Sequence, residues 1–381
     1  MMSSASDKTV PNSCSARPSK RSAISLGTGS SGVAGGGHLA LIYAAALAVL
    51  ALLLVLNLAM GPAAAHVTAL QALYSLVHHL LPMIHIPAHG LPSDADIIVW
   101  QLRLPRALMA IMIGGLLGYA GVALQGLLMN PLADPYTVGV SAGAAVGAAL
   151  AETLGFSVLL GGLGGIATAF VLAMLAVWLV YAISKVGGRV SIHTFILAGV
   201  VVGGFLWSTI PLLLVLANRS NDLARMLFYL IGSLQQSNWS QAEMLFPFLF
   251  VVAWWFQVWA QDLNLMTLGE ETAAHLGVEI EPLKKRVLLL ASLGTAAAVS
   301  AGGIIGFVGL VTPHAARKLV GPDHRRLLPL AAIFGAILLI ASDTIVRVFL
   351  NDMPVGVVTS IVGAPVFCIL LRRRKITGGA N

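Results

Sequence analysis

Two arginines stand three residues apart in the segment 102–106, at positions 103 and 106. Side chains with this spacing share one face of a helix, so Arg103 and Arg106 would present two positive charges together. Arg347, at the end of a later apolar run, is a third charged group in a similar position. Judged by residue type and spacing alone, these guanidinium groups would reach lipid head groups along their aliphatic stems.

A second functional pattern lies in the charged stretch 262–286. Residues 268–277 are predicted to form a short helix, with Thr267 and Glu270 as a capping box at its start and Gly277 as its stop. Leucine and alanine side chains give this helix a modest apolar side. Two interpretations stay open: the helix docks on a partner protein, or it is an ordinary solvated loop helix.

The sequence contains no motif of a nucleotide-binding or hydrolytic enzyme. None of the seven lysines follows a glycine, which excludes a P-loop, and no HExxH, GxSxG or paired-cysteine motif occurs. We therefore predict that the chain is not an enzyme, has no catalytic residues, and holds no metal ion or cofactor itself. Five histidines could ligate haem iron, but we interpret them as ordinary loop composition because no metal-ligand spacing repeats. They are His66, His78, His79, His85 and His89.

Composition indicates which elements position these residues. Of 381 residues, 58% are hydrophobic and 10% charged, against about 45–50% and about 25% in soluble domains. Such a small number of charges would coat a soluble fold of this size too thinly. The composition excludes a soluble enzyme, a disordered protein and a nucleic-acid-binding protein, and it predicts an all-α membrane protein with many spans.

Apolar runs predict ten transmembrane helices, since about 20 apolar residues cross a bilayer. The expected spans are 39–60, 103–129, 137–154, 158–183, 191–216, 240–260, 287–301, 304–320, 327–349 and 355–371. Residues 39–375 are predicted to form a single membrane domain. Residues 1–38 are predicted to be a disordered cytoplasmic tail, and 376–381 a short cytoplasmic C-terminal tail.

Basic residues predict the orientation of these spans. With the N-terminus inside, 17 of the 22 lysines and arginines fall on the cytoplasmic side, as the positive-inside rule expects. Ten spans then place both termini in the cytoplasm, whereas nine would put the basic cluster 372–375 outside. Arg103, Arg106 and Arg347 are among the five basic residues left on the outer side.

Glycines four residues apart recur in the predicted spans. Such small-xxx-small pairs let helix backbones approach closely. We expect them to serve packing within the chain, with a dimer seam or a moving face as the alternative. The pairs are Gly114 and Gly118, Gly143 and Gly147, Gly199 and Gly203, and Gly302 and Gly306.

Four long segments carry specific motifs. They are LRLPRALMAIMIGGLLGYAGVALQGLLMNPLADPYTVGVSAGAAVGA (102–148), LGEETAAHLGV (268–278), GGIIGFVGLVTPHAARKLVGPDHRRLLP (302–329) and MPVGVVTSIVGAPVF (353–367). Together they resemble the FecCD-type permeases, the membrane subunits of bacterial ABC importers for iron chelates, haem and cobalamin. The resemblance covers about residues 39–375 and implies the type II ABC importer permease fold, with ten helices per subunit.

The resemblance also implies partners and a location. A homodimer would sit in the bacterial inner membrane, with two cytoplasmic ATPase subunits and a periplasmic or surface substrate-binding protein. ATP and Mg would be bound by the partner ATPase, and no nucleic acid is expected.

Site residues follow from the same resemblance. Arginines that dock the binding protein correspond to Arg103, Arg106 and Arg347. The coupling helix, which sits in a cleft of the ATPase, corresponds to Leu268, Gly269, Glu270, Glu271, Ala274, Leu276 and Gly277. The inner gate region corresponds to Ser191, Ile192, His193 and Thr194. Similar proteins often have a small polar residue in place of His193. This histidine could gate the pathway, contact haem or cap the helix, and we favour the structural role as a helix cap.

The function implied is import of an iron chelate, either a ferric siderophore or haem. The chelate would pass from the binding protein to the cytoplasm by alternating access. Cobalamin is the alternative cargo, and an ion-coupled secondary transporter is the alternative of a different class. Acidic residues are scarce within the predicted spans, which disfavours ion coupling.

Overall fold

The computed structural model describes residues 36–61, 67–80, 93–186, 189–216 and 220–378. Nearly all of the predicted N-terminal tail therefore lies outside the described residues. The helices up to the middle of the chain are α1 (Gly36–Ala59), α2 (Ala69–Leu80), α3 (Ser93–Ile97), η1 (Ile98–Arg103), α4 (Leu104–Leu127), η2 (Pro135–Val138), α5 (Val140–Leu154), η3 (Phe156–Gly162), α6 (Gly164–Ser184) and α7 (Ile192–Leu216). The later helices are α8 (Ser220–Ile231), α9 (Trp239–Val258), α10 (Ala260–Met266), α11 (Glu270–His275), α12 (Ile280–Gly302), α13 (Val308–Val320), α14 (His324–Phe349) and α15 (Val355–Gly378).

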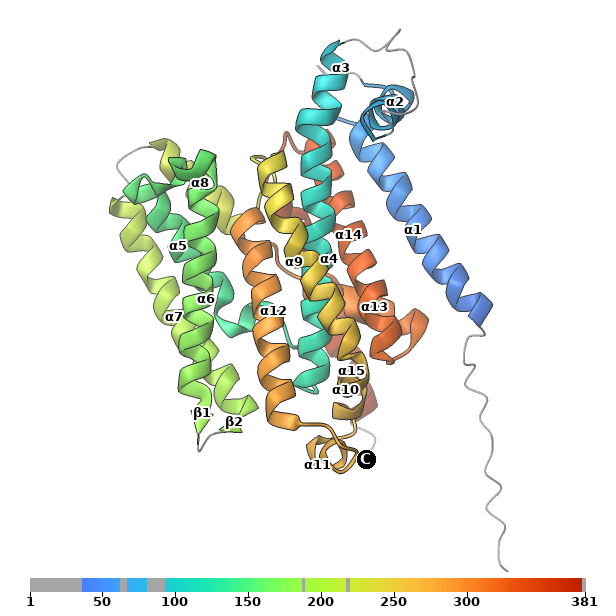
Figure 1. Ribbon diagram of the computed structural model, residues 1–381. Helices are drawn as coiled ribbons and strands as arrows, with labels where there is room; N and C mark the ends of the chain where they lie inside the picture. The colour runs from blue at the N-terminus through green and yellow to red at the C-terminus, as the bar shows by residue number, and fades with distance from the viewer. Residues whose placement is uncertain (1–35, 62–66, 81–92, 187–188, 217–219, 379–381) are drawn as a thin grey trace, which may run out of the picture.

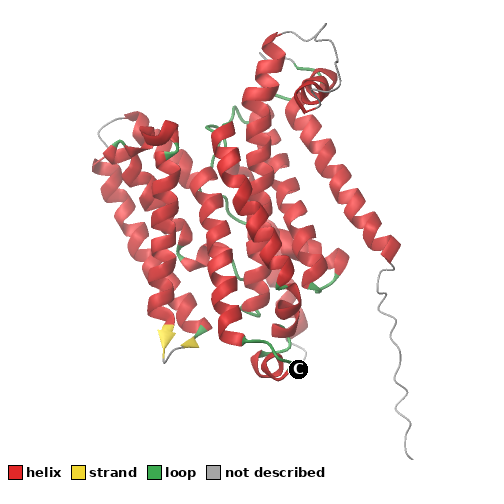
Figure 2. Cartoon of the chain, viewed as in Figure 1, coloured by secondary structure: helices red, strands yellow, loops and turns green. Residues whose placement is uncertain are grey.

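The described chain is almost entirely helical, as predicted (Figure 2). Its two short strands, β1 (Lys185–Val186) and β2 (Arg189–Val190), pair antiparallel and close the turn between α6 and α7. This hairpin brings the end of one long apolar helix directly to the start of the next.

A helix lies on each of the ten predicted spans. Among the described residues, six helices are long and apolar enough to cross a membrane, and two shorter ones are apolar over 10–17 residues. The six are Gly37–Ala59, Asp94–Leu127, Gly164–Ser184, Ile192–Leu216, Trp239–Val258 and His324–Phe349, and the shorter two are Val140–Leu154 and Val355–Ile369. The remaining two predicted spans fall on α12, which begins with charged residues, and on α13, which has 13 residues. The prediction of an all-α polytopic fold is confirmed.

Helix α4 is the central element of the bundle, and most of its residues are buried. It crosses α14 at glycines: a Cβ atom added to Gly114 would lie 2.3 Å from the carbonyl oxygen of Gly335. One turn along, a Cβ atom on Gly118 would lie 2.5 Å from the carbonyl oxygen of Ala331. The two backbones are thus in direct contact, which only residues without a large side chain permit.

The other glycine pairs mostly follow the same rule. Gly143 and Gly147 on α5 meet α6, and Gly199 on α7 meets the backbone of Thr137. Packing within the chain, the favoured interpretation, is confirmed at these positions. It is wrong for Gly306, which has nothing within 4 Å of an added Cβ atom because it lies in the turn before α13.

The bundle has two distinct ends (Figure 1). Helices α2, α3 and α8 lie at one end, which we call the α2 end. The β1–β2 hairpin, α10 and α11 lie at the opposite end, which we call the α11 end, and the C-terminal helix α15 also finishes there. The residues with predicted roles divide between these two ends.

Candidate functional sites at the two ends of the bundle

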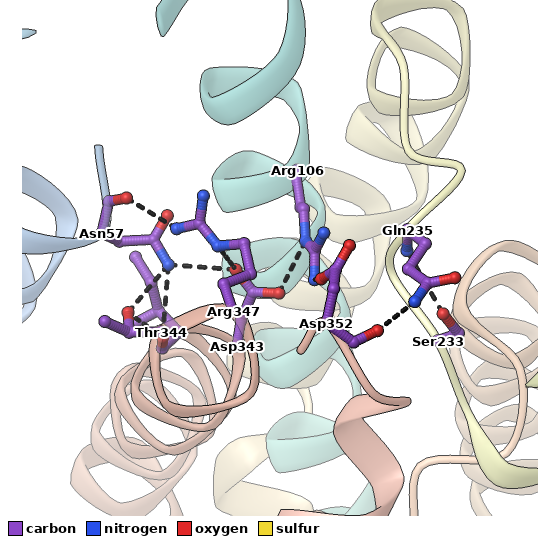
Figure 3. A network of polar contacts seen from close by, with 9 residues as sticks. Asn57, Arg106, Ser233, Gln235, Asp343, Thr344, Arg347 and Asp352 are labelled. Atoms are coloured by element: carbon purple, nitrogen blue, oxygen red, sulfur yellow. Dashed lines mark hydrogen bonds and ion pairs between the residues drawn. The ribbon is translucent and has the colours of Figure 1, made fainter. Parts of the chain in front are cut away.

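A buried ion network lies at the α2 end (Figure 3). Asp343 on α14 has no exposed side-chain surface, and its Oδ1 atom lies 2.7 Å from Nε of Arg106 on α4. Its Oδ2 atom lies 3.1 Å from Nε of Arg347 and accepts a hydrogen bond from Nδ2 of Asn57 on α1. Arg106 also extends Nη2 to within 2.7 Å of Asp352 Oδ1. A single carboxylate thus joins three helices.

Arginines also complete the end of α1. Arg103 Nη1 donates hydrogen bonds to the carbonyls of Leu58 and Ala59 at 2.7 and 2.9 Å. Arg347 Nη2 donates to the carbonyl of Asn57 at 2.6 Å. The last carbonyls of a helix have no partner within the helix, and its C-terminus favours a positive charge. The two guanidinium groups supply the hydrogen-bond donors and the positive charge, and they fasten α1 to the bundle.

The structure places all three predicted docking arginines in the interior of the chain. Arg103, Arg106 and Arg347 are 4%, 8% and 6% exposed. Reaching lipid head groups, as spacing alone suggested, is therefore the wrong interpretation, because each guanidinium is held by groups of the protein. Arg103 is the last residue of the π-helix η1, and Arg106 follows in the first turn of α4.

Asp343 is a member of this network to which sequence reasoning gave no role. The available signal was its position four residues before Arg347 in an apolar helix. Ionisable residues within a membrane span are rare and pair with one another. The partner on α4, Arg106, is 237 residues away in sequence, so its identity was not readable from local spacing.

The ion pairs of the network join two arginines to two aspartates, and one member is exposed. Arg106 and Arg347 both pair with Asp343, Arg106 also pairs with Asp352, and the side chain of Asp352 is 39% exposed. It lies in a turn in which both Asn351 and Asp352 have positive φ angles, of 47° and 61°. Its backbone carbonyl accepts a hydrogen bond from Gln235. The two arginines therefore already hold two carboxylates of the chain itself.

The residues predicted to form a coupling helix lie at the α11 end. Helix α11 is shorter than predicted and begins after Gly269, whose φ angle is 102°. The predicted capping box is absent because Thr267 Oγ1 donates to the carbonyl of Asn264, and the Glu270 carboxylate pairs with Lys284 instead. The predicted stop is present: Gly277 has a φ angle of 91°, and the backbone turns there.

The face of α11 that points away from the bundle is apolar and acidic. Leu268 and Leu276 are 60% and 57% exposed, and Glu271 and Ala274 are exposed as well. Within α11, only Ala273 is buried. Two large apolar side chains at one protruding helix are a surface that a partner protein can bury.

The predicted gate residues form the start of α7. Ser191 is the capping residue: its Oγ accepts the backbone N–H of Thr194 at 3.4 Å, and its carbonyl accepts from Phe195. His193 is exposed. The capping role that we expected of His193 therefore belongs to Ser191, which the standard preference for serine at helix starts could have indicated.

Another polar cluster holds α10 on the first turn of α14. Asn264 Nδ2 donates to Asp323 Oδ1 at 2.7 Å, and Asn264 Oδ1 accepts the backbone N–H of His324 at 2.8 Å. Burial by itself raises the pKa of Asp323, but hydrogen bonds from Asn264 and the Arg325 backbone outweigh it and lower the pKa below its usual value. The contribution of this carboxylate to stability is therefore present at neutral pH and is lost as the pH falls through the lowered pKa.

Two of the five outer histidines lie in the described residues, both on α2. His79 Nε2 is 3.1 Å from Asp96 Oδ2, and its ring stacks on Trp100 with centroids 4.1 Å apart. His66, His85 and His89 lie outside the described residues. In the part of the chain that the structure describes, no three His, Cys, Asp or Glu side chains come together as metal ligands. His79 thus fastens α2 to α3.

Comparison with known proteins places this architecture in a family. The FecCD transport family matches residues 47–373. A protein of Halobacterium salinarum described as "Cobalamin import system permease protein BtuC" is 42% identical over 287 residues, covering 75% of this chain and 76% of the relative. The "Hemin transport system permease protein HmuU" of Yersinia pestis is 36% identical over 293 residues, covering 75% of this chain and 87% of the relative.

A further relative and a solved structure agree with this family assignment. The "Molybdate import system permease protein MolB" of Haemophilus influenzae is 36% identical over 286 residues, covering 74% of this chain and 83% of the relative. A solved structure described as an inward-facing conformation of a metal-chelate type ABC transporter superposes with a TM-score of 0.75 at 28% identity. That match covers 88% of this chain and 99% of the other. An ion-coupled carrier, the alternative of a different class, is thereby set aside. The chain belongs to the FecCD transport family and is a membrane permease of the ABC importer class.

Proposed function

We propose that this permease imports a metal chelate, which a binding protein delivers at the α2 end and ATPase subunits drive from the α11 end. The observation that carries the proposal is α11 itself. It protrudes from the bundle between two glycines with Leu268 and Leu276 exposed, and its sequence motif is that of the family's coupling helix. A partner that buries this helix gains apolar contact, and its movement can be passed to the bundle through α11.

The proposed cargo is an iron chelate, a ferric siderophore or haem. Support comes from the 36% identical relative named for hemin transport. Cobalamin is the second candidate, and the 42% identical relative named for cobalamin import supports it. All of these cargoes are bulky metal complexes, and a pathway with few charged side chains lets such ligands pass without binding them tightly.

The working unit is proposed to be a homodimer in the bacterial inner membrane, with two ATPase subunits that bind ATP and Mg. The exposed face of α7 fits a role at the pathway beside a second copy, since Leu197, Val201 and Phe205 are each more than half exposed. Both termini would be cytoplasmic, in line with the charge distribution along the sequence.

Docking of the binding protein is proposed to involve Arg103, Arg106 and Arg347. Because these side chains are buried and Arg106 already pairs with Asp343 and Asp352, a partner carboxylate would reach the network from its exposed side by displacing Asp352. The arginines would therefore act through the network and not as three separate surface charges.

Transport itself is proposed to occur by alternating access. ATP-driven closure of the ATPase subunits would move α11, and the start of α7 at Ser191–Thr194 would open or close the inner side of the pathway. Neither ATP binding nor hydrolysis would require residues of this chain.

The experiment is uptake in a deletion strain with and without the restored gene. Labelled ferric siderophore, haem and cobalamin are supplied in parallel, with all partner proteins present. Uptake of one label that needs both the gene and ATP identifies the cargo and supports the proposal. Uptake of none of the three contradicts the proposed cargo class.

A further inference from the structure

Lys284 is a buried cation that connects three elements at the α11 end. It lies in the second turn of α12 with 5% of its side chain exposed. Its Nζ atom is 2.7 Å from Glu270 Oε2, at the start of α11, and 3.3 Å from Glu281 Oε1 on its own helix. The other oxygen of that second carboxylate accepts the backbone N–H of Val190 on β2 at 3.0 Å.

These contacts form a continuous path between two functional regions. Val190 is buried, and the next residue is Ser191, which caps α7 and begins the predicted gate region. The path therefore runs from α11 through Glu270, Lys284 and Glu281 to the backbone that precedes α7. Every link in it is an ion pair or a hydrogen bond between described residues.

The path matters for the orientation of α11, because the chain on either side of this helix is flexible. Gly269 and Gly277 flank the helix with φ angles of 102° and 91°, in a region that glycine enters freely. A helix of six residues between two such glycines is oriented weakly by its own chain. The ion pair between Glu270 and Lys284 ties the first turn of α11 to α12, so a displacement of α11 moves the Lys284 side chain.

From this geometry we propose that Lys284 and Glu281 are positioning residues that transmit movement of the ATPase-docking helix α11 to the start of α7. The inference rests on the proposed function, since it assumes that an ATPase docks on α11. It goes beyond that function because it names the side chains that link the docking helix to the gate. A buried lysine with two carboxylate partners suits this role. Moving Glu270 away would leave the buried charge of Lys284 with one partner, so Lys284 and Glu281 would have to shift as well.

The test measures movement at the start of α7 in the complex of this chain with its co-purifying ATPase. A single cysteine is introduced by His193→Cys, an exposed position, after replacement of Cys14 and Cys368 by serine. The rate of maleimide labelling is recorded with and without ATP plus vanadate, together with ATP hydrolysis. Lys284→Met removes the charge and keeps most of the stem, and Lys285→Met, at the exposed neighbour, is the matched control.

In the His193→Cys protein that keeps Lys284, we expect ATP to change the labelling rate about fivefold or more, in the range of typical coupling between sites. The control variant Lys285→Met should show the same change. In Lys284→Met the change should vanish while ATP hydrolysis persists, and Lys284→Arg should restore part of it. An unchanged ATP response in Lys284→Met overturns the inference. If that variant does not assemble with the ATPase, Glu281→Gln is measured, and an unchanged response there overturns it equally. Failure of the unsubstituted chain to co-purify with any ATPase would instead contradict the proposed function.

Discussion

At the scale of single residues, the α2 end depends on one carboxylate. Asp343 is fully buried and faces two guanidinium groups and an amide, from α4, α14 and α1. Burying charges of both signs is expensive in free energy, so the network is stable only while its members remain paired. Through these pairs the network fixes the positions of Arg106 and Arg347 within the bundle.

The first prediction compares the two acidic members of the network. Asp343→Asn should destabilise the protein by about 3–5 kcal/mol, because it removes the carboxylate paired with Arg347 and one of the two carboxylates paired with Arg106, both buried. Asp352→Asn is the comparison: its side chain is 39% exposed, and Arg106 keeps Asp343 as a partner, so a smaller loss of stability is expected. Thermal unfolding in detergent measures both. Equal shifts in the two variants would show that the buried carboxylate has no special role.

The second prediction concerns reversal of the arginine charges. From the sequence, the double change Arg103→Glu and Arg106→Glu would abolish transport in a protein that remains folded. Because both side chains are buried against carbonyls and Asp343, we now expect the double variant to lose the folded state as well. Size-exclusion chromatography of the purified variant decides this. A monodisperse, stable variant without transport would favour direct docking by exposed arginines.

At the scale of elements, the molecule combines close helix crossings with one protruding helix. The α4–α14 crossing brings backbones into contact at Gly114 and Gly335, which fixes the geometry of the central helix. Helix α11 shows the opposite arrangement, since most of its side chains are exposed. One element is rigid because of its packing, and the other is available for a partner.

The third prediction tests the crossing. Gly114→Ala should destabilise the protein by about 1–3 kcal/mol, the usual effect of overpacking, since the new Cβ atom would lie 2.3 Å from a backbone oxygen. Gly165→Ala on α6 is the matched control, because an added Cβ atom there meets only Ser157 at 3.8 Å. Unfolding midpoints of the two variants are compared. A Gly114 variant as stable as the control would mean that the helices can separate freely.

The fourth prediction tests the face of α11. The double change Leu268→Asp and Leu276→Asp should prevent co-purification of the ATPase and leave the unfolding midpoint of the permease nearly unchanged. Both side chains are more than half exposed, so their replacement disturbs little within the chain. Leu73→Asp on α2, also exposed, serves as the control at the other end of the bundle. Retention of the ATPase by the double variant would place the docking surface elsewhere.

At the scale of the whole molecule, the two ends differ in chemistry. The α2 end holds the arginine network, and the α11 end holds the proposed docking helix, the β1–β2 hairpin and the end of α15 (Figure 1). The proposed transporter, driven from one side and loaded from the other, needs this separation. The link through Lys284 lies at the α11 end, directly beside α11.

The fifth prediction concerns the sidedness of the ends. In a background without Cys14 and Cys368, a cysteine at Leu73 should react with an impermeant maleimide added outside intact cells. A cysteine at Leu276 should react only in inverted vesicles. The expectation follows from the excess of basic residues at the predicted inner segments. Labelling of both positions from the same side would contradict the ten-span arrangement.

The sequence by itself determined the helical class, the positions of ten helical segments, the position of the short helix α11 and the family motifs. These are local properties: hydropathy over about 20 residues predicts a span, and glycines such as Gly277 end a helix where the chain must turn. Local patterns depend on neighbours in the chain, which the sequence gives directly. The bounds differed at several helix ends: α6 begins at Gly164 and α12 at Ile280, where spans were expected from 158 and 287, and α11 begins at Glu270.

Only the tertiary structure decided the partners of the charged side chains. Arg106 pairs with a carboxylate 237 residues away, so spacing suggested an exposed arginine where the structure has a buried one. Glu270 appeared to cap its own helix, but Lys284 binds it because α12 folds back beside α11. A buried charge takes whichever opposite charge the packing brings close, and packing depends on the whole arrangement of helices.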